Sequence, residues 1–208
     1  MSSMPAHASH ATKPQPSRSH AEPDGLAEVL TRASTGDNDA WRQLTDAYAP
    51  RVHALLISRC NNPELAEELT QSVFVTIALK MRDGGYAEEG KFEAWLFRIA
   101  MNRLRDEMRR LRRRGDAGSQ PLEYEEAKPQ ATPDPGDDLT RLRGAMRTLN
   151  EADRDIIELR HHGQMSFKAM ADLLGEPVGT LLARHHRALR KLKSAIESAS
   201  GPKRQADG

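Results

Sequence analysis

The alternation of apolar and polar residues is most regular between residues 92 and 114. Apolar residues recur there at every third or fourth position, the spacing that gathers side chains on one face of a helix. This apolar face consists of Phe92, Leu96, Ile99, Ala100, Leu104, Met108 and Leu111. The opposite face carries Arg98, Asn102, Arg105, Arg109 and Arg112, with Trp95 at the border. The segment therefore predicts a helix that packs against a core on one side and presents arginines on the other.

Two interpretations of the arginine face are open. Many amphipathic helices simply carry a solvated charged face. Here the polar residues are nearly all arginine, and further arginines follow at 109–110 and 112–114. Such a concentration favours a polyanionic partner, of which a nucleic-acid backbone is the commonest.

The same periodicity predicts helices in most of the remaining chain, and a content of 38% hydrophobic and 4% aromatic residues suits small helical domains better than a large sheet protein. Helix-start signals precede several of them, such as Asn62-Pro63 and the Asn150/Asp153 pair, and Pro50 is expected to bend or split a helix. The sequence thus predicts an all-α protein with two small helical domains. The expected divisions are a disordered tail (1–23), a first domain (24–114), a flexible acidic Pro/Gly linker (115–138), a second domain (139–199) and a second tail (200–208).

The second domain has the pattern of a helix-turn-helix. A short helix at 166–174 is followed by Gly175 and by a long basic helix from about residue 177. In the long helix Thr180, Ala183, Arg187, Arg190 and Ser194 are expected outside, and Val178, Leu181, His185, Leu189, Leu192 and Ile196 inside. No acidic residue occurs between Glu176 and Glu197, so this helix can approach phosphates without repulsion.

Composition narrows the possible functions. The single cysteine, Cys60, excludes an intramolecular disulfide framework and a cysteine-based zinc site. The adjacent pairs His161-His162 and His185-His186 are expected to be structural or to face phosphates, because neighbouring residues on a helix do not face one ligand. No phosphate loop, nucleophile constellation or apolar membrane span is present. We therefore expect a cytoplasmic protein that is not an enzyme and needs no metal or cofactor.

Four motifs occur in an order that is specific to one family. They are DAWRQLTDAYAPRV, AEELTQSVFVTIAL, KFEAWLFRIAMNRLRDEMRR and LNEADRDIIELRHHGQMSFKAMADLLGEPVGTLLARHHRALRKLK. Together they resemble an extracytoplasmic-function sigma factor of the sigma-70 family over roughly residues 25–196, apart from the linker. The resemblance implies a protein that binds bacterial core RNA polymerase and directs it to promoters, which it recognises and melts.

The resemblance also implies roles for individual residues. On periodicity alone Phe74 could belong to the core or to a partner surface; the family places it with Glu68 and Gln71 on the helix that binds the β′ clamp of polymerase. Residues 84–91 correspond to the loop that traps a flipped base. The implied minus-ten residues are Tyr86, Lys91, Trp95, Arg98, Asn102, Arg105 and Arg109. The implied minus-thirty-five residues are Thr180, Ala183, Arg184, Arg187, Arg190 and Lys191.

The sequence departs from the family at Leu182 and Ala183, where many relatives carry Lys-Ser before the arginine. The minus-thirty-five preference is therefore open.

Further expected partners are the β subunit of polymerase, promoter DNA and an anti-sigma factor, without membrane insertion. The alternative function is a sigma-like decoy that binds an anti-sigma protein without engaging DNA. The arginine faces of both domains argue against that alternative.

Overall fold

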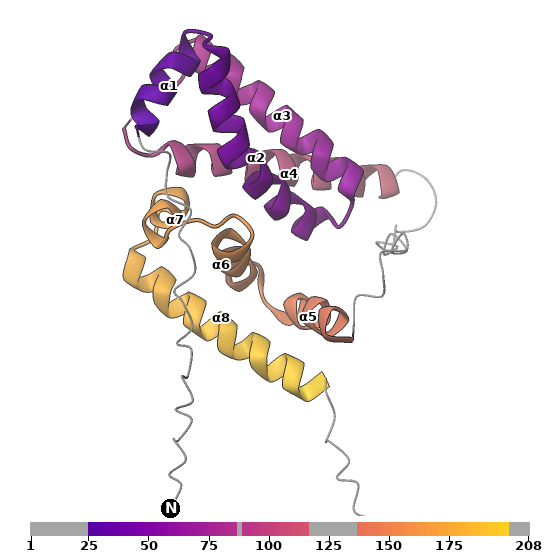
Figure 1. The fold of residues 1–208 in the computed structure, drawn as a ribbon. Coiled ribbons are helices and arrows are strands. Elements are labelled where there is room, and N and C mark those ends of the chain that lie inside the picture. Colours follow the sequence, from indigo (N-terminus) through magenta and orange to yellow (C-terminus); the bar gives the residue numbers. More distant parts are fainter. Residues whose placement is uncertain (1–24, 87–88, 117–136, 200–208) are drawn as a thin grey trace, which may run out of the picture.

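The computed structural model describes residues 25–86, 89–116 and 137–199, and all regular structure in these ranges is helical. The predicted all-α class is confirmed. The elements are α1 (Leu26–Ser34), α2 (Asn38–Cys60), α3 (Pro63–Arg82), α4 (Phe92–Asp116), α5 (Asp137–Thr148), α6 (Glu151–His161), α7 (Phe167–Leu174) and α8 (Val178–Ala199) (Figure 1). Both expected tails and nearly all of the expected linker lie outside the described residues. In the described ranges no helix is long and apolar enough to cross a membrane.

Helices α1 to α4 form what we call the N-terminal unit. Its core includes the fully buried side chains of Tyr48, Leu55, Leu56, Ile77, Leu96 and Phe97. Asp37 caps α2 by accepting hydrogen bonds from the amides of Asp39 and Ala40, and Asn62 caps α3 through the amide of Leu65. These two helices therefore begin at the capping residues that the sequence predicts.

Of the two outcomes expected at Pro50, the split is wrong, because α2 continues through it to Cys60, whereas the bend stays a prediction. Pro50 is exposed. The carbonyl that loses its amide partner can therefore bond to water, which lowers the cost of proline inside the helix. At the end of α2 the buried thiol of Cys60 donates to the carbonyl of Asn62, 3.3 Å away.

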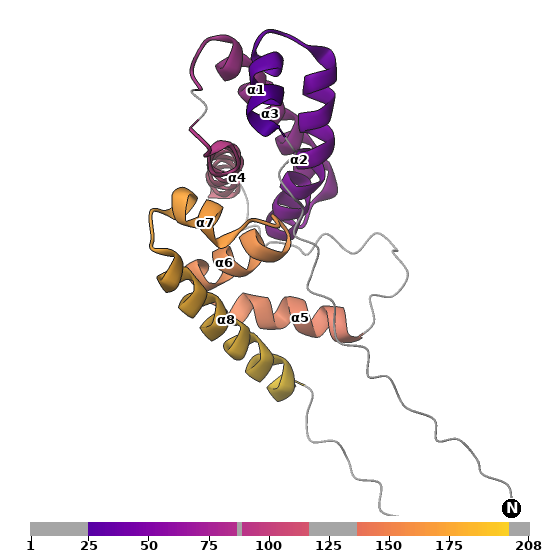
Figure 2. The same ribbon diagram turned by 60° about the vertical axis from the view of Figure 1, so that its left-hand side comes forward.

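Helices α5 to α8 form the C-terminal unit, in which the long α8 packs across α5, α6 and α7 (Figures 1 and 2). Asn150 caps α6, Ser166 caps α7, and Gly175 ends α7 in the left-handed region at φ 72°. The helix-turn-helix predicted from the spacing thus corresponds to α7 and α8. Val178 and Leu189 were expected inside but are 39% and 37% exposed, because the apolar stripe of α8 is wider than the face its neighbours cover.

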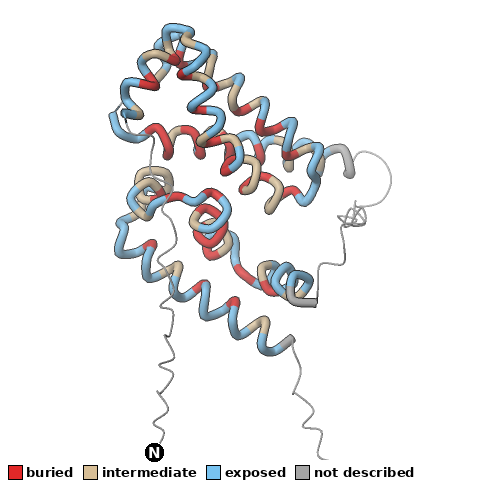
Figure 3. Tube along the Cα trace, viewed as in Figure 1, coloured by how far each residue is buried: buried red, intermediate tan, exposed pale blue. Residues whose placement is uncertain are grey.

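The two units pack against each other. Helix α7 lies against α4, and α6 contacts α2. Figure 2 shows α4 nearly end-on above α7 and α6. Buried positions run along both α4 and α6 (Figure 3). The sequence predicted the two helical units but not this arrangement.

Candidate nucleic-acid interface

The polar face of α4 is divided between solvent and the C-terminal unit. Asn102 and Arg105 are exposed, and Nη1 of Arg105 donates to Oδ1 of Asn102 at 3.3 Å. Arg98, one turn earlier, instead donates from Nη2 to the carbonyls of Asp172 and Leu173, at 2.9 and 3.2 Å. The first part of the arginine face therefore already has a protein partner.

The polar residues further along α4 make fewer contacts with the rest of the protein. Arg109 lies 3.9 Å from Asp106, and both side chains are about three-quarters exposed. Arg103, on another side of the helix, donates to Oγ1 of Thr76 on α3 at 2.9 Å. Asn102, Arg105 and Arg109 thus remain available to an anion, while Arg103 helps to join α4 to α3.

Aromatic rings pack together at the start of α4, in edge-on and tilted pairs. The ring centroids of Tyr86 and Trp95 are 4.5 Å apart, and those of Tyr86 and Phe92 are 5.6 Å apart. Phe92 is buried and contacts Tyr48 edge-on, whereas Tyr86 and Trp95 are half-buried. Lys91 beside them is exposed, and residues 87–88 of the expected base-trapping loop lie outside the described residues. The exposed portions of Tyr86 and Trp95 give this end of α4 an aromatic surface beside a cation, a combination suited to an unstacked base.

Helix α3 presents a mixed polar and apolar surface. Glu68 and Gln71 are exposed, whereas Phe74 is half-buried and packs against the core. Val75 and Leu79 are 59% and 46% exposed and lie one turn apart. Sequence analysis missed Leu79, although its position four residues after Val75 is a signal of a shared face. Val75 and Leu79 thus form a small exposed apolar patch on α3, which is a candidate surface for binding another protein.

The outer face of α8 is only partly available to DNA. Thr180, Ala183, Arg187 and Arg190 are exposed. Arg184 instead forms a two-bond ion pair with Glu176, at 2.7 and 2.6 Å, and this hydrogen bonding raises the pKa of its guanidinium. Lys191 is paired with Asp153 of α6. Two of the six residues expected to contact the minus-thirty-five element are therefore engaged within the C-terminal unit.

Two histidines from different predicted pairs meet between α6 and α8. Their Nε2 atoms, in His161 and His185, are 3.2 Å apart. At that distance one nitrogen must donate and the other accept, so the two rings cannot both carry their second proton without repulsion. Burial, followed by neighbouring positive groups, lowers the pKa of both residues from the ordinary value of 6.5. The two predicted histidine pairs thus contribute a contact in which at most one ring can be protonated.

We expect the contribution of the His161–His185 contact to the stability of the C-terminal unit to fall as the pH falls from 7.5 to 5.5. A histidine whose pKa is lower in the folded than in the unfolded chain favours unfolding once the pH drops below the unfolded value, near 6.5. Thermal melts of wild type and His185→Gln test this, and the wild type should lose more over that range. Glu158, whose pKa burial raises to about 7, acts in the opposite sense in both proteins and cancels in the difference. Parallel pH profiles, or an equal change for His53→Gln on α2, would contradict the prediction.

The comparisons with known proteins agree with this geometry. The family model for Sigma-70 region 2 matches residues 44–114, and the family model for Sigma-70, region 4 matches residues 145–194. RNA polymerase sigma factor CarQ of Myxococcus xanthus is 31% identical over 170 residues, which cover 80% of this chain and 95% of CarQ. ECF RNA polymerase sigma factor RpoE of Cereibacter sphaeroides is 31% identical over 165 residues, which cover 76% of this chain and 86% of that RpoE.

Solved structures with the same fold include CnrH in complex with the cytosolic domain of CnrY. That match has a TM-score of 0.60 and 25% identity, and covers 82% of this chain and 96% of CnrH. The sigma factor RpoE in complex with the anti-sigma factor NepR from Bartonella quintana matches with a TM-score of 0.55. Its identity of 22%, over 75% of this chain and 96% of that one, supports the fold alone.

Proposed function

The chain belongs to the extracytoplasmic-function group of the sigma-70 family, and from this premise we propose how its helices share the work of an RNA polymerase sigma factor. Sigma factors bind core RNA polymerase and direct transcription initiation at promoters; they regulate transcription rather than catalyse a reaction. The proposal assigns core binding and promoter melting to residues 24–114 and upstream recognition to residues 139–199.

The exposed pair of Asn102 and Arg105 on α4 carries the proposal for the minus-ten element. Their amide and guanidinium can bond to base edges and phosphates, and the Tyr86–Trp95 surface can receive an unstacked base. Lys91, Arg98 and Arg109 extend the same positive face. We assign this face to the DNA strand that is separated at the start of transcription. Unstacking one base costs a few kcal/mol, which stacking and charge-assisted bonds can offset.

For the minus-thirty-five element we propose α8 as the helix that enters the major groove. Thr180, Arg187 and Arg190 supply polar contacts, and Ala183 offers an apolar contact beside them. Arg184 and Lys191 join this surface if DNA displaces Glu176 and Asp153 from their ion pairs. The β′ clamp is the proposed partner of Glu68, Gln71 and Phe74, and the β subunit that of the C-terminal unit. An anti-sigma partner is also proposed, as for the RpoE structure that contains NepR.

Transcription in vitro tests the assignment directly. Purified chain and core RNA polymerase, with genomic promoter fragments as template, are expected to yield transcripts that need the chain but need no ATP hydrolysis to open the promoter. Core polymerase alone is the control. Tight binding to core without any chain-dependent transcript would favour the decoy function.

A substitution on α3 tests the polymerase surface. Leu79→Lys places a charge in the exposed apolar pair of Val75 and Leu79, so we expect core binding to weaken by about 10- to 100-fold, as for a central interface residue. Because Leu79 is already exposed, the thermal stability should hardly change. Competition for core polymerase against a labelled sigma factor measures the effect. The control is Thr31→Lys, which adds the same charge at an exposed position of α1 and should bind core polymerase as wild type does. An equal loss of core binding in both variants would refute a specific α3 surface.

A further inference from the structure

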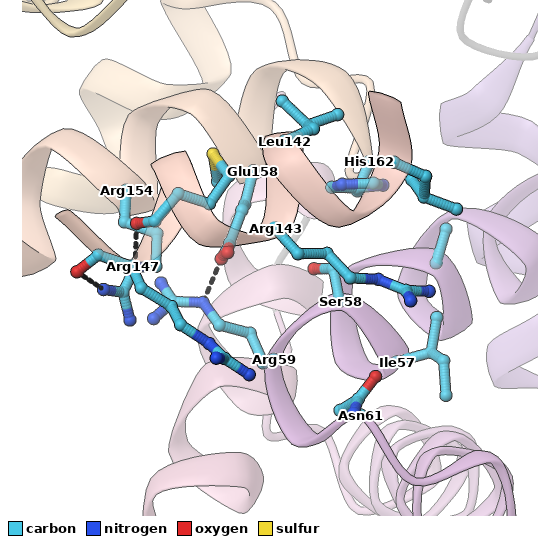
Figure 4. A pocket seen from close by; sticks show the side chains of 13 residues that line it. Ile57, Ser58, Arg59, Asn61, Leu142, Arg143, Arg147, Arg154, Glu158 and His162 are labelled. Atoms are coloured by element: carbon cyan, nitrogen blue, oxygen red, sulfur yellow. Dashed lines mark hydrogen bonds and ion pairs between the residues drawn. The ribbon is translucent and has the colours of Figure 1, made fainter. Parts of the chain in front are cut away.

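We propose that the cavity between α2, α5 and α6 binds a nucleoside di- or triphosphate (Figure 4). The cavity has a volume of about 460 Å³, within the range of pockets that hold small ligands in proteins. Its walls combine arginines with apolar side chains. None of the residues proposed to bind polymerase or DNA lines it, so the site is separate from the surfaces of the proposed function.

Positive charge dominates the cavity. Among the residues that the structure describes, one carboxylate, that of Glu158, lines it together with four arginines, Arg59, Arg143, Arg147 and Arg154. The pKa of Arg59 is lowered, chiefly by burial and further by the charge of Arg154, although Glu158 acts to raise it. Cations held this close repel one another, and a multiply charged anion between them would relieve the repulsion.

Helix α5 supplies the cations best placed for a phosphate. Arg143 and Arg147 are exposed, lie one turn apart and extend from α5 toward α2 (Figure 4). Arg143 forms no ion pair or hydrogen bond within the described residues. Its planar guanidinium presents paired donors that match two phosphate oxygens. We therefore expect Arg143 to bind the phosphates directly.

Arg154 has a different task in the wall of the cavity. It donates from Nε to the carbonyl of Met146 at 3.2 Å and from Nη2 to that of Arg147 at 3.3 Å. These carbonyls lie at the end of α5, where helix carbonyls lack amide partners. Arg154 thus holds the end of α5 beside the cavity and adds its charge to the site.

The carboxylate of the cavity opposes an anion only weakly. Glu158 pairs with Arg59, and its side chain is 3% exposed. Burial raises its pKa to about 7 despite the neighbouring Arg59 and Arg154, so near neutral pH much of it carries no charge. Asp155 also pairs with Arg59. The charge of Arg59 is therefore balanced within the protein, and the arginines of α5 provide the excess that attracts phosphate.

An apolar wall indicates that the ligand is more than a phosphate. Leu139 and Leu142 of α5 line the cavity and are 40% and 38% exposed. Ile57 and Met146 complete this wall and are partly buried. Such side chains can cover the face of a nucleobase, and a thioether contacts aromatic rings favourably. Asn61 offers an amide for the base edge or the sugar. Inorganic phosphate would leave the apolar wall in water.

A nucleotide in this cavity would contact both units, because α2 belongs to the N-terminal unit and α5 and α6 to the C-terminal unit. A ligand that binds only the packed arrangement stabilises it by mass action. Separation of the units would in turn weaken nucleotide binding. The cavity would thus couple the packing of the two units to nucleotide concentration.

Isothermal titration calorimetry of the full-length protein tests the proposal, with ADP and ATP as probes in a buffer without divalent cations. Both should bind saturably at one site per chain, and more weakly as salt is added. Adenosine lacks the phosphates and pyrophosphate lacks the base, so each should bind about tenfold more weakly than ADP or worse. Pyrophosphate that binds as tightly as ADP would overturn the assignment of a nucleotide.

Two substitutions separate the phosphate and base contacts. Arg143→Gln should weaken ADP binding by about tenfold or more, because a charge-assisted bond is lost. Leu142→Gln should weaken the binding of ADP but leave that of pyrophosphate unchanged. Both residues are exposed, so the melting temperature should hardly change.

The controls remove arginines outside the cavity. Arg42→Gln on α2 and Arg105→Ala on α4 each remove an exposed arginine, and both variants should bind ADP as wild type does. Equal losses for Arg105→Ala and Arg143→Gln would overturn the proposal, because phosphates would then bind arginines without selection. Absence of saturable binding at millimolar ADP and ATP would overturn it as well. Transcription with core polymerase would still test the proposed function independently.

Discussion

The single substitutions Asn102→Ala and Arg105→Ala are each expected to remove most promoter opening while leaving core binding intact. Both side chains are exposed on α4 and bond only to each other in this contact, so their removal should hardly lower the stability of the N-terminal unit. A hydrogen bond to a charged group contributes about 1.5–3 kcal/mol, so each substitution should lower open-complex formation roughly 10- to 100-fold. Permanganate reactivity of unpaired thymines in the promoter measures opening, and competition for core polymerase measures binding.

Arg103→Ala supplies the control for these variants. Arg103 is an exposed arginine of the same helix, but it points to Thr76 on α3 rather than to the proposed DNA face. It should open promoters nearly as well as wild type. If Asn102→Ala and Arg105→Ala lost core binding instead, and promoter opening were normal once polymerase was saturated, the face would be misassigned.

Arg51→Met is expected to give the largest loss of stability. Arg51 lies in the buried part of α2, pairs with buried Glu93 and donates to the Gly163 carbonyl. Removal of one member of a buried ion pair leaves an uncompensated charge, so the free energy of unfolding should fall by about 3–5 kcal/mol. Urea unfolding followed by circular dichroism measures the change.

A second substitution distinguishes the buried charge from lost packing. Arg51→Met combined with Glu93→Gln removes the uncompensated carboxylate and should recover part of the lost stability. Arg42→Met, which breaks an exposed pair on the same helix, should cost far less. Equal urea midpoints for Arg51→Met and wild type would show that the Arg51–Glu93 pair contributes nothing to the fold.

Local patterns account for what the sequence predicts correctly. A cap such as Asn62 or Asn150 bonds to an amide three residues later, and a core stripe such as that of α4 repeats within four residues. These relations are contained in a short window. The helices, their starts and the helix-turn-helix could therefore be predicted without the structure.

Contacts between distant segments account for what the sequence does not predict. Arg98 and its carbonyl partners are 74 and 75 residues apart, and Arg51 and Gly163 are 112 apart. A guanidinium that can bind DNA can equally bind the end of a helix, so its type alone does not identify its partner. Arg184 is a further example, because Glu176 lies within reach only after the turn between α7 and α8 has formed. The exposure of Pro50, which allows α2 to continue, depends in the same way on the assembled unit.

The state of Cys60 has a practical consequence for spectroscopy. It is the one cysteine of the chain, it is 3% exposed, and burial raises the pKa of its thiol above the ordinary value. Because maleimides and iodoacetamides react with thiolates that solvent can reach, the folded protein should be nearly inert to them. Cysteines introduced at exposed positions, such as Thr35 before α2 and Lys193 on α8, should then take fluorophores or spin labels selectively. Distances between the two units could thus be followed in single molecules without first removing the native thiol.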